Sequence, residues 1–245
     1  MALVTRRDEG GIAILSLNRP EALNALSPSL FAELRAHVVA LKDQAETIGT
    51  VILRGEGRSF CAGNDLRAIQ AGEAAPTPEF QSSTVDLIEN LPQPVLCAVQ
   101  GHCYTGGLEL ALSADIIVAG ASARFSDTHG KWGMTPLWGM SRRLPERVGM
   151  QRAKEMMFSG RAVGAEEAVR IGLALEVVAD AGLDAHVLAM AQGFVANSWH
   201  TLRADKMLVN HGQNHGHWGA LEFERRNSPG RGPDIQERLK AFGKG

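Results

Sequence analysis

The chain has 245 residues, of which 44% are hydrophobic and 21% charged, and its formal net charge is −2. This composition is typical of a globular protein with a sizeable core, and the near-neutral charge offers no basic surface for nucleic acid or an anionic membrane. No apolar run approaches the roughly 20 residues that cross a bilayer, and no secretory leader is evident, so we expect a cytoplasmic protein without membrane or nucleic-acid partners. The three cysteines lack metal-ligand spacing, so we expect unpaired thiols and no metal site; they are Cys61, Cys97 and Cys103.

The start of the chain alternates strand and helix patterns. Residues 4–7 and 12–18 flank the segment DEGG and predict a β-hairpin. Ser27 followed by Pro28 predicts the start of a helix, because a capping residue there precedes proline at the first helical position. Apolar residues then recur at helical spacing over residues 31–41, which predicts one buried face.

Two turns that contain glycine follow strand patterns. The first, FCAGNDL (60–66), comes after a strand expected at 50–54. The second, GHCYTGGLEL (101–110), comes after a strand expected at 95–99 and leads into a helix. Two such turns can direct backbone N–H groups at one developing oxyanion, and glycine lets a substrate carbonyl approach closely. Glu109 follows the two adjacent glycines of the second turn, and a carboxylate beside that oxygen can carry out acid–base chemistry. We therefore expect an enzyme that acts on an acyl group.

The rest of the chain becomes mainly helical. A strand is expected at 116–119 and another at 174–178. The alternation of strands and helices before residue 149 favours a layered α/β fold of the βαβ type. Helices are expected at 108–114, 151–158, 165–171, 183–197 and 198–210.

Several segments resemble the enoyl-CoA hydratase/isomerase (crotonase) family. One glycine motif alone would be weak support, but these segments follow one another in order at the family's spacing over nearly the whole chain. A fainter match is DIQERLKAF (234–242), which resembles the family's C-terminal acidic-then-AF signature. The segments are LNRPEALNALS (17–27), GEGRSFCAGNDL (55–66), PVLCAVQGHCYTGGLELALSADIIVA (94–119), ARFSDTHGKWGMTP (123–136), LPERVGMQRAKEMMFSGR (144–161) and AEEAVRIGLALEVV (165–178).

The resemblance implies an architecture and a substrate. The expected fold is a crotonase-like α/β spiral of ββα units over residues 1–190, with a C-terminal helical trimerisation region over residues 191–245. The implied substrate is an acyl-CoA thioester, so coenzyme A belongs to the substrate and no separate cofactor is expected. The implied assembly is a homotrimer or a dimer of trimers. In the family a basic run after the AF signature can reach CoA on a neighbouring subunit, whereas here only Lys240 and Lys244 remain.

The resemblance also assigns the catalytic residues. The thioester oxygen is expected between the backbone N–H groups of Asn64 and Gly106, the oxyanion hole. Glu109 matches the family's first catalytic glutamate, which would deprotonate the water that adds to the β-carbon, and partial burial would raise its pKa. His129 stands where well-known hydratases carry a second glutamate, and a histidine can orient water or pass a proton to the α-carbon. Asp127 is close enough in sequence to orient His129.

Further residues are expected to bind the acyl-CoA, largely through backbone groups, or to line the acyl pocket, although their side chains could equally serve loop structure. They are Ala22, Asn24, Phe60, Ala62, Gly63, Asp65, Leu66, Tyr104, Gly107 and Gly130.

Three other groups have two interpretations each. An aromatic and methionine cluster either shapes an acyl tunnel or packs in the core; its members are Trp132, Met134, Trp138 and Met140. Arg142 and Arg143 either reach phosphates or form a solvated helix face. A histidine cluster lies in a polar, glycine-rich stretch without a carboxylate or cysteine partner, so we expect no metal there; its members are His211, His215 and His217.

The leading functional hypothesis is a 2-enoyl-CoA hydratase in which Glu109 activates water and His129 assists protonation of the α-carbon. An enoyl-CoA isomerase is an alternative, although its chemistry depends on a carboxylate at the position where this chain has His129. Hydrolase or carbon–carbon lyase chemistry also stays open, because an oxyanion hole suits any thioester enolate. The alternative from a different class is a non-catalytic acyl-CoA binder, in which Glu109 would be idle.

Overall fold

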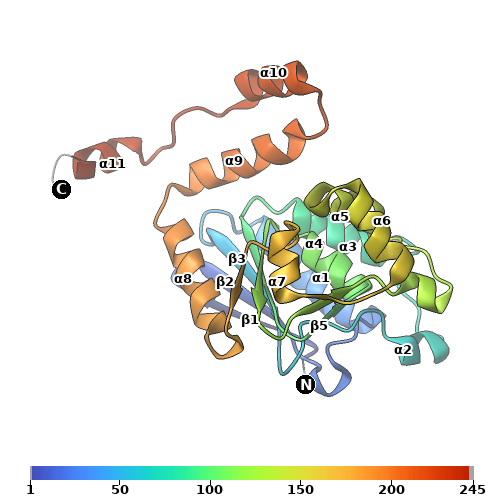
Figure 1. Cartoon of the computed structure of the whole chain (residues 1–245). Coiled ribbons are helices and arrows are strands. Elements are labelled where there is room, and N and C mark those ends of the chain that lie inside the picture. Colours follow the sequence, from blue (N-terminus) through green and yellow to red (C-terminus); the bar gives the residue numbers. More distant parts are fainter. Residues whose placement is uncertain (1, 243–245) are drawn as a thin grey trace.

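A six-stranded sheet forms the centre of the fold, in the order β1-β2-β3-β4-β6-β9. The computed structural model describes residues 2–242, and Figure 1 shows helices on both faces of the sheet. Within this sheet β1 and β2 are antiparallel, and each later strand runs parallel to its neighbour. The bounds are β1 Val4–Glu9, β2 Ile12–Leu17, β3 Thr50–Gly55, β4 Val95–Val99, β6 Ile116–Gly120 and β9 Glu176–Val178.

The hairpin predicted at the start of the chain is confirmed. Glu9 lies opposite Ile12 in the register of β1 and β2, so the loop consists of Gly10 and Gly11 alone. Their φ angles are +55° and +80°, a combination that suits a two-residue hairpin turn and that glycine adopts without steric cost. Asp8, expected in the turn, therefore belongs to the strand.

The helices follow the predicted pattern over most of the chain. The start of α1 is as predicted, because the Ser27 hydroxyl accepts a hydrogen bond from the Leu30 N–H at 3.2 Å and Pro28 is the first helical residue. The bounds are α1 Pro28–Lys42, α2 Leu66–Gln70, α3 Phe80–Glu89, α4 Gly106–Leu112, α5 Met140–Val148, α6 Met150–Ser159, α7 Ala165–Arg170, α8 Leu183–Val195, α9 Trp199–Gly212, α10 His217–Asn227 and α11 Ile235–Phe242, with short 3-10 helices at Pro20–Ala22, His129–Trp132 and Asp180–Gly182.

The sheet separates two hydrophobic layers. Strands β2, β3 and β4 are almost wholly buried, as parallel strands covered on both faces are. Alternate residues such as Leu15 and Leu53 join the larger cluster, which includes α1, α3 and α4. Their neighbours Ile14 and Ile52 face the smaller cluster, which includes Val187 of α8. The period-two alternation of the strands therefore divides the core between the two faces.

A small second sheet supports the second glycine turn. It has the order β5-β7-β8 and consists of β5 His102–Tyr104, β7 Arg124–Ser126 and β8 Val163–Gly164. These strands were not predicted from the sequence, and of α5 only a helical setting for Arg142 and Arg143 was expected. The strands have only two or three residues, too few for an alternating pattern. Helix α5 has a polar sequence with Pro145 in its interior, and proline usually interrupts a helix.

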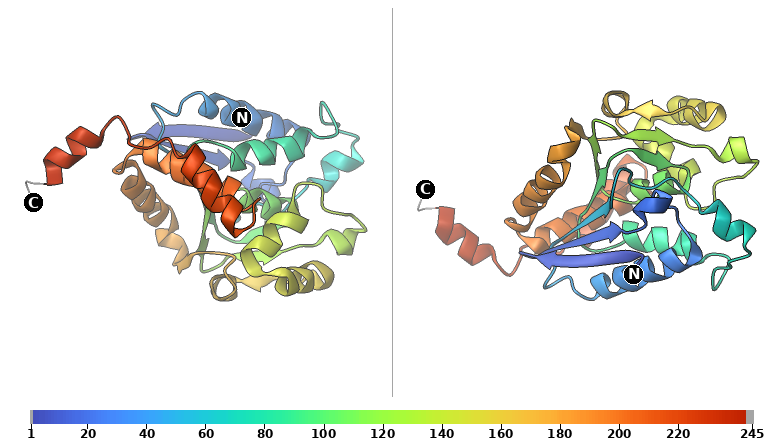
Figure 2. Two further views of the ribbon diagram at one scale, coloured as in Figure 1. Left: turned by 90° about the horizontal axis from the view of Figure 1, so that it is seen from above. Right: turned by 90° about the horizontal axis from the view of Figure 1, so that it is seen from below.

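The C-terminal helices differ from the rest of the chain in burial. Helix α8 runs across residue 190 and packs on the sheet, whereas α9, α10 and α11 contain no buried residue. Figures 1 and 2 both show α11 extending away from the body of the molecule. Helix α9 is attached through Lys206, whose Nζ lies 2.8 Å from Asp115 Oδ2. Across residues 2–242, no helix combines the length and the apolar character needed to cross a bilayer.

Candidate active site

The two glycine turns predicted from the sequence lie side by side. The Cys61 N–H donates to the His102 carbonyl at 2.8 Å, and the Tyr104 N–H donates to the Cys61 carbonyl at 3.0 Å, which forms a parallel bridge between Cys61 and Cys103. Burial raises the pKa of the Cys61 thiol to about 12, so the thiol stays protonated and packs as an apolar side chain. The turns are therefore held together by their own backbones.

Asn64 and Gly106 each present a free backbone N–H group at this junction. Among the described residues, neither N–H donates to a protein acceptor. Gly106 is the first residue of α4, where N–H groups have no partner within the helix. Both residues line a cavity of about 590 Å³. Two free amides on one cavity wall are the arrangement that binds a developing oxyanion.

The glycines of the second turn are required by their neighbours. A Cβ on Gly107 would lie 2.5 Å from the Cys61 carbonyl oxygen, inside the first turn. A Cβ on Gly106 would overlap the Trp138 ring. The absence of side chains at both positions thus serves close packing as well as access to the amides.

Glu109 is the buried acid of the site. Its exposed fraction is 1%, and its Oε1 accepts hydrogen bonds from the N–H groups of Trp138 at 2.9 Å and Met140 at 3.1 Å. Its Oε2 lies 3.8 Å from His129 Nε2. Burial raises the pKa of Glu109 above its ordinary value, and the two amide donors and His129 offset this only in part. One carboxylate oxygen is therefore fixed by the backbone while the other faces His129.

His129 and Asp127 form a hydrogen-bonded pair. His129 Nδ1 lies 2.6 Å from Asp127 Oδ1, which also accepts the His129 backbone N–H at 3.0 Å. A carboxylate oxygen accepts in such a bond, so Nδ1 carries the proton. The other ring nitrogen, Nε2, faces Glu109. Burial opposes a charged imidazole, but the hydrogen bond and charge of Asp127 and the charge of Glu109 outweigh it, and together they raise the pKa of His129.

The aromatic and methionine cluster lies partly in the cavity wall and partly in the core. Trp132, Met134 and Trp138 line the cavity. Met140 instead lies in the core, with its side chain fully buried. The Trp138 ring also packs edge-on against Phe31, with ring centroids 5.0 Å apart. The pocket and packing interpretations of this cluster therefore each apply to part of it.

The predicted acyl-CoA contacts fall into two groups. Three of these residues line the same cavity as the catalytic residues, namely Ala62, Leu66 and Tyr104. Their contact with the ligand stays a prediction for both groups. The remaining residues lie outside this lining; they are Ala22, Asn24, Phe60, Gly63, Asp65, Gly107 and Gly130.

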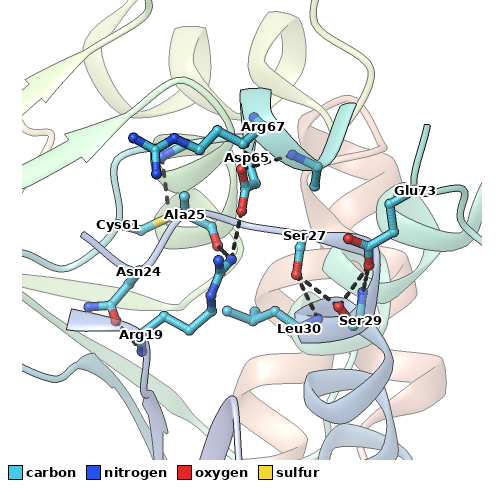
Figure 3. A network of polar contacts seen from close by, with 12 residues as sticks. Arg19, Asn24, Ala25, Ser27, Ser29, Leu30, Cys61, Asp65, Arg67 and Glu73 are labelled. Carbon is cyan, nitrogen blue, oxygen red and sulfur yellow. Dashed lines mark hydrogen bonds and ion pairs between the residues drawn. The ribbon is translucent and has the colours of Figure 1, made fainter. Parts of the chain in front are cut away.

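Two side chains in the second group, those of Asn24 and Asp65, serve the scaffold around the first turn, and Figure 3 shows their contacts with Arg19. The buried Asn24 amide donates to the carbonyls of Glu56 at 2.9 Å and Ser59 at 2.8 Å and accepts the Arg19 N–H at 2.8 Å. Asp65 caps α2 and accepts from Arg19 Nη1 at 2.8 Å. Although burial acts against the carboxylate, Arg19 and the amide donors lower the pKa of Asp65.

The backbone amides that hold Glu109 were not predicted from the sequence. The N–H donors of Trp138 and Met140 lie 29 and 31 residues beyond it in the chain. The only local signal in the sequence is the glycine at position 139, which takes a φ of +102° in the structure.

The two neighbouring arginines differ from each other, because Arg142 pairs with Glu146 on the exposed face of α5 whereas Arg143 is buried. A solvated face therefore describes Arg142 alone.

The C-terminal candidates lie away from the cavity. His211 and His215 each stack on Phe223 with ring centroids 5.5 Å apart. Within residues 2–242, no group of three histidine, cysteine or acidic side chains is arranged to hold a metal ion. Lys240 belongs to α11, and Lys244 falls outside the described residues.

Comparisons with known proteins agree with this geometry. The family model described as enoyl-CoA hydratase/isomerase matches residues 7–242. The short-chain-enoyl-CoA hydratase of Clostridium acetobutylicum is 34% identical over 220 residues, which cover 88% of this chain and 84% of that protein. The crystal structure of enoyl-CoA hydratase from Bacillus anthracis matches with a TM-score of 0.92 and 30% identity, covering 99% of this chain and 96% of that one. A Thermobifida fusca structure in complex with acetoacetyl-CoA matches with a TM-score of 0.83 and 30% identity, covering 92% of each chain.

Proposed function

We propose that this chain, which belongs to the enoyl-CoA hydratase/isomerase family, adds water across the 2,3 double bond of an enoyl-CoA thioester. One observation carries the proposal. Glu109 Oε2 and His129 Nε2 lie 3.8 Å apart on the cavity that also holds the free amides of Asn64 and Gly106. Two groups at this separation can both reach one water molecule. An acid, a base and an oxyanion site are thus available to one substrate.

The oxyanion hole stabilises the enolate-like state. The thioester oxygen binds between the N–H groups of Asn64 and Gly106, which line the cavity. These donors belong to the folded backbone and are in place before reaction, so they need little reorganisation when charge develops. Each such donor stabilises the transition state by about 3 kcal/mol.

The acid–base steps divide between two side chains. The Glu109 carboxylate takes a proton from water as the water oxygen bonds to the β-carbon. His129 gives its Nε2 proton to the α-carbon, which completes the addition. The proton that Glu109 took from water then passes to His129, whose Nε2 is 3.8 Å from Glu109 Oε2. This transfer restores both groups for the next turnover. The raised pKa of each group suits this exchange, because Glu109 is a stronger base and His129 stays protonated to higher pH.

The cellular setting and assembly are part of the proposal. The three buried, unpaired thiols found within residues 2–242 support a reducing, cytoplasmic compartment. Trp218 and Phe242 in the C-terminal helices are 76% and 88% exposed, which supports their burial by another subunit in a homotrimer or dimer of trimers. No cofactor besides the substrate's own coenzyme A takes part.

Loss of ultraviolet absorbance from crotonyl-CoA and from a longer enoyl-CoA tests the activity. We expect both to be hydrated, with 3-hydroxyacyl-CoA as the product. Release of free coenzyme A would instead indicate a hydrolase, and movement of the double bond would indicate an isomerase. Binding of both thioesters without any turnover would contradict the hydratase assignment and leave another CoA-ester reaction or a non-catalytic binder.

Asp127→Asn is expected to move the alkaline limb of the pH profile. Asp127 raises the pKa of His129, so removing its charge lowers that pKa and the imidazolium is lost at a lower pH. The alkaline limb of kcat/KM should therefore shift to lower pH by at least about one unit. The acidic limb, set by Glu109, serves as the internal reference and should move much less. An unchanged alkaline limb in a folded variant would contradict the role of Asp127.

A further inference from the structure

The turn at residues 138–140 carries both amide donors that hold Glu109. The N–H groups of Trp138 and Met140 converge on Oε1 at 2.9 and 3.1 Å, which forms a small backbone anion site. Gly139 between them has a φ of +102°, which a residue with a side chain rarely adopts. The position of the Glu109 carboxylate therefore depends on the conformation of this turn.

Arg143 holds the turn from the side opposite Glu109. Its Nη1 donates to the Trp138 carbonyl at 2.6 Å, and its backbone N–H donates to the Gly139 carbonyl at 2.9 Å. A Cβ on Gly139 would collide with Arg143 Nη1. The Arg143 side chain is only 9% exposed. The arginine is thus packed directly on the turn.

The other edge of the guanidinium is fixed to α3. Arg143 Nε and Nη2 donate to the two oxygens of Glu89 at 3.0 and 2.6 Å, and Nη2 also donates to Asp86 Oδ1 at 2.7 Å. A bidentate arginine–carboxylate pair fixes direction as well as distance. A lysine keeps the charge but not this planar fork.

We infer that Arg143 is a positioning residue for Glu109, acting through the turn at residues 138–140, an inference that rests on the proposed function and extends it. Arg143 is not among the residues that line the cavity, so it has no contact with substrate in the site. Its bond to the Trp138 carbonyl orients the turn whose amides hold Oε1, and Oε2 is left facing His129.

The inference predicts a specific kinetic signature. If the turn relaxes, its amides hold the Glu109 carboxylate less well. Those amides lower the pKa of Glu109 against the effect of burial, so their loss raises this pKa further. Less carboxylate is then present at a given pH, and the acidic limb of kcat/KM moves to higher pH. The KM should change much less than kcat, because Arg143 itself does not line the cavity.

Arg143→Lys and Arg143→Gln test this signature, with Arg142→Gln as the matched control on the exposed face of α5. We expect kcat to fall about tenfold to a hundredfold, as small misplacements of reacting groups do. The acidic limb should rise more in Arg143→Gln than in Arg143→Lys. Arg142→Gln should keep both the rate and the limb. Since Arg143→Gln removes a buried arginine from its ion pairs with the more exposed Asp86 and Glu89, Glu89→Gln provides a milder variant with the same expected direction.

Two further measurements separate positioning from a general loss of stability. In the Glu109→Gln background, Arg143→Lys should have almost no additional effect on the residual rate, because the residue it positions is already gone. Carbon-13 labelling of glutamate carboxyl groups follows the titration of Glu109 directly, with its signal assigned by its loss in Glu109→Gln. A folded Arg143→Lys variant in which Glu109 titrates as in the wild type would overturn the inference. The titration needs no turnover, so absence of hydration in the wild type would contradict the proposed function alone.

Discussion

Glu109→Gln is expected to lower kcat/KM for crotonyl-CoA by about 10²–10⁴-fold, the range that a positioned general base contributes. The substitution keeps the size of the side chain. Its amide oxygen can still accept the N–H groups of Trp138 and Met140, which now bond to Oε1. It cannot take a proton from water. The folded structure and acyl-CoA binding should therefore survive while the chemical step is lost.

Glu33→Gln is the matched control for this experiment. Glu33 also accepts two backbone N–H groups, from Leu3 at 2.7 Å and Val4 at 3.0 Å, but it lies outside the cavity lining. Its replacement should leave the rate per folded molecule unchanged. Measurement of kcat/KM and of the dissociation constant for an acyl-CoA in both variants separates loss of the chemical step from loss of binding. Glu109→Gln with activity near that of the wild type would show that another group activates the water.

Gly106→Ala is expected to reduce kcat by about 10²–10³-fold, the effect of losing one oxyanion donor. The new methyl group would overlap the Trp138 ring, so either α4 or the ring must move. Movement of α4 displaces the Gly106 N–H from the oxyanion. Movement of Trp138 disturbs the N–H that it donates to Glu109 at 2.9 Å. Both responses reduce the stabilisation of the transition state more than that of the bound substrate.

Gly193→Ala in α8 is the control for Gly106→Ala. Both glycines are helical, but a Cβ on Gly193 meets no atom within 4 Å. Alanine there should keep activity and stabilise the helix slightly. Steady-state kinetics with crotonyl-CoA should show a fall in kcat for Gly106→Ala alone. A normal kcat in Gly106→Ala would mean that the Gly106 amide does not contribute to the oxyanion site.

The elements that could be predicted are those whose pattern is local. Each of these patterns depends on neighbouring residues, and each is present in the structure. They are the strand segments of the first half of the chain, the capped helix start at Ser27 and the two glycine turns. The crotonase-like α/β fold expected from the resemblance is confirmed by the match to the Bacillus anthracis structure over 99% of the chain. The extent of α5 was not predicted because Pro145 and the polar sequence of this segment conceal a helical pattern.

Side-chain roles around the first turn were harder to predict than the shape of the turn. Asn24 was expected to contact acyl-CoA, largely through its backbone, or to serve loop structure, and its side-chain amide donates to the carbonyls of Glu56 and Ser59, 32 and 35 residues away. A buried amide must find partners wherever the fold brings them. Which partners these are depends on tertiary packing, and no local pattern around Asn24 specifies them.

Local sequence patterns identified the types of residue available for catalysis and the turns that expose backbone amides, because glycine conformations and short-range hydrogen bonds are local. The pairing of Asp127 with His129 is of this kind, since the two residues are neighbours in the chain. The approach of His129 Nε2 to Glu109 and the bond from Arg143 to the turn holding Glu109 could be seen only in the folded chain. Those contacts join separate helices and loops, so they arise when the core packs and fixes the distances between them.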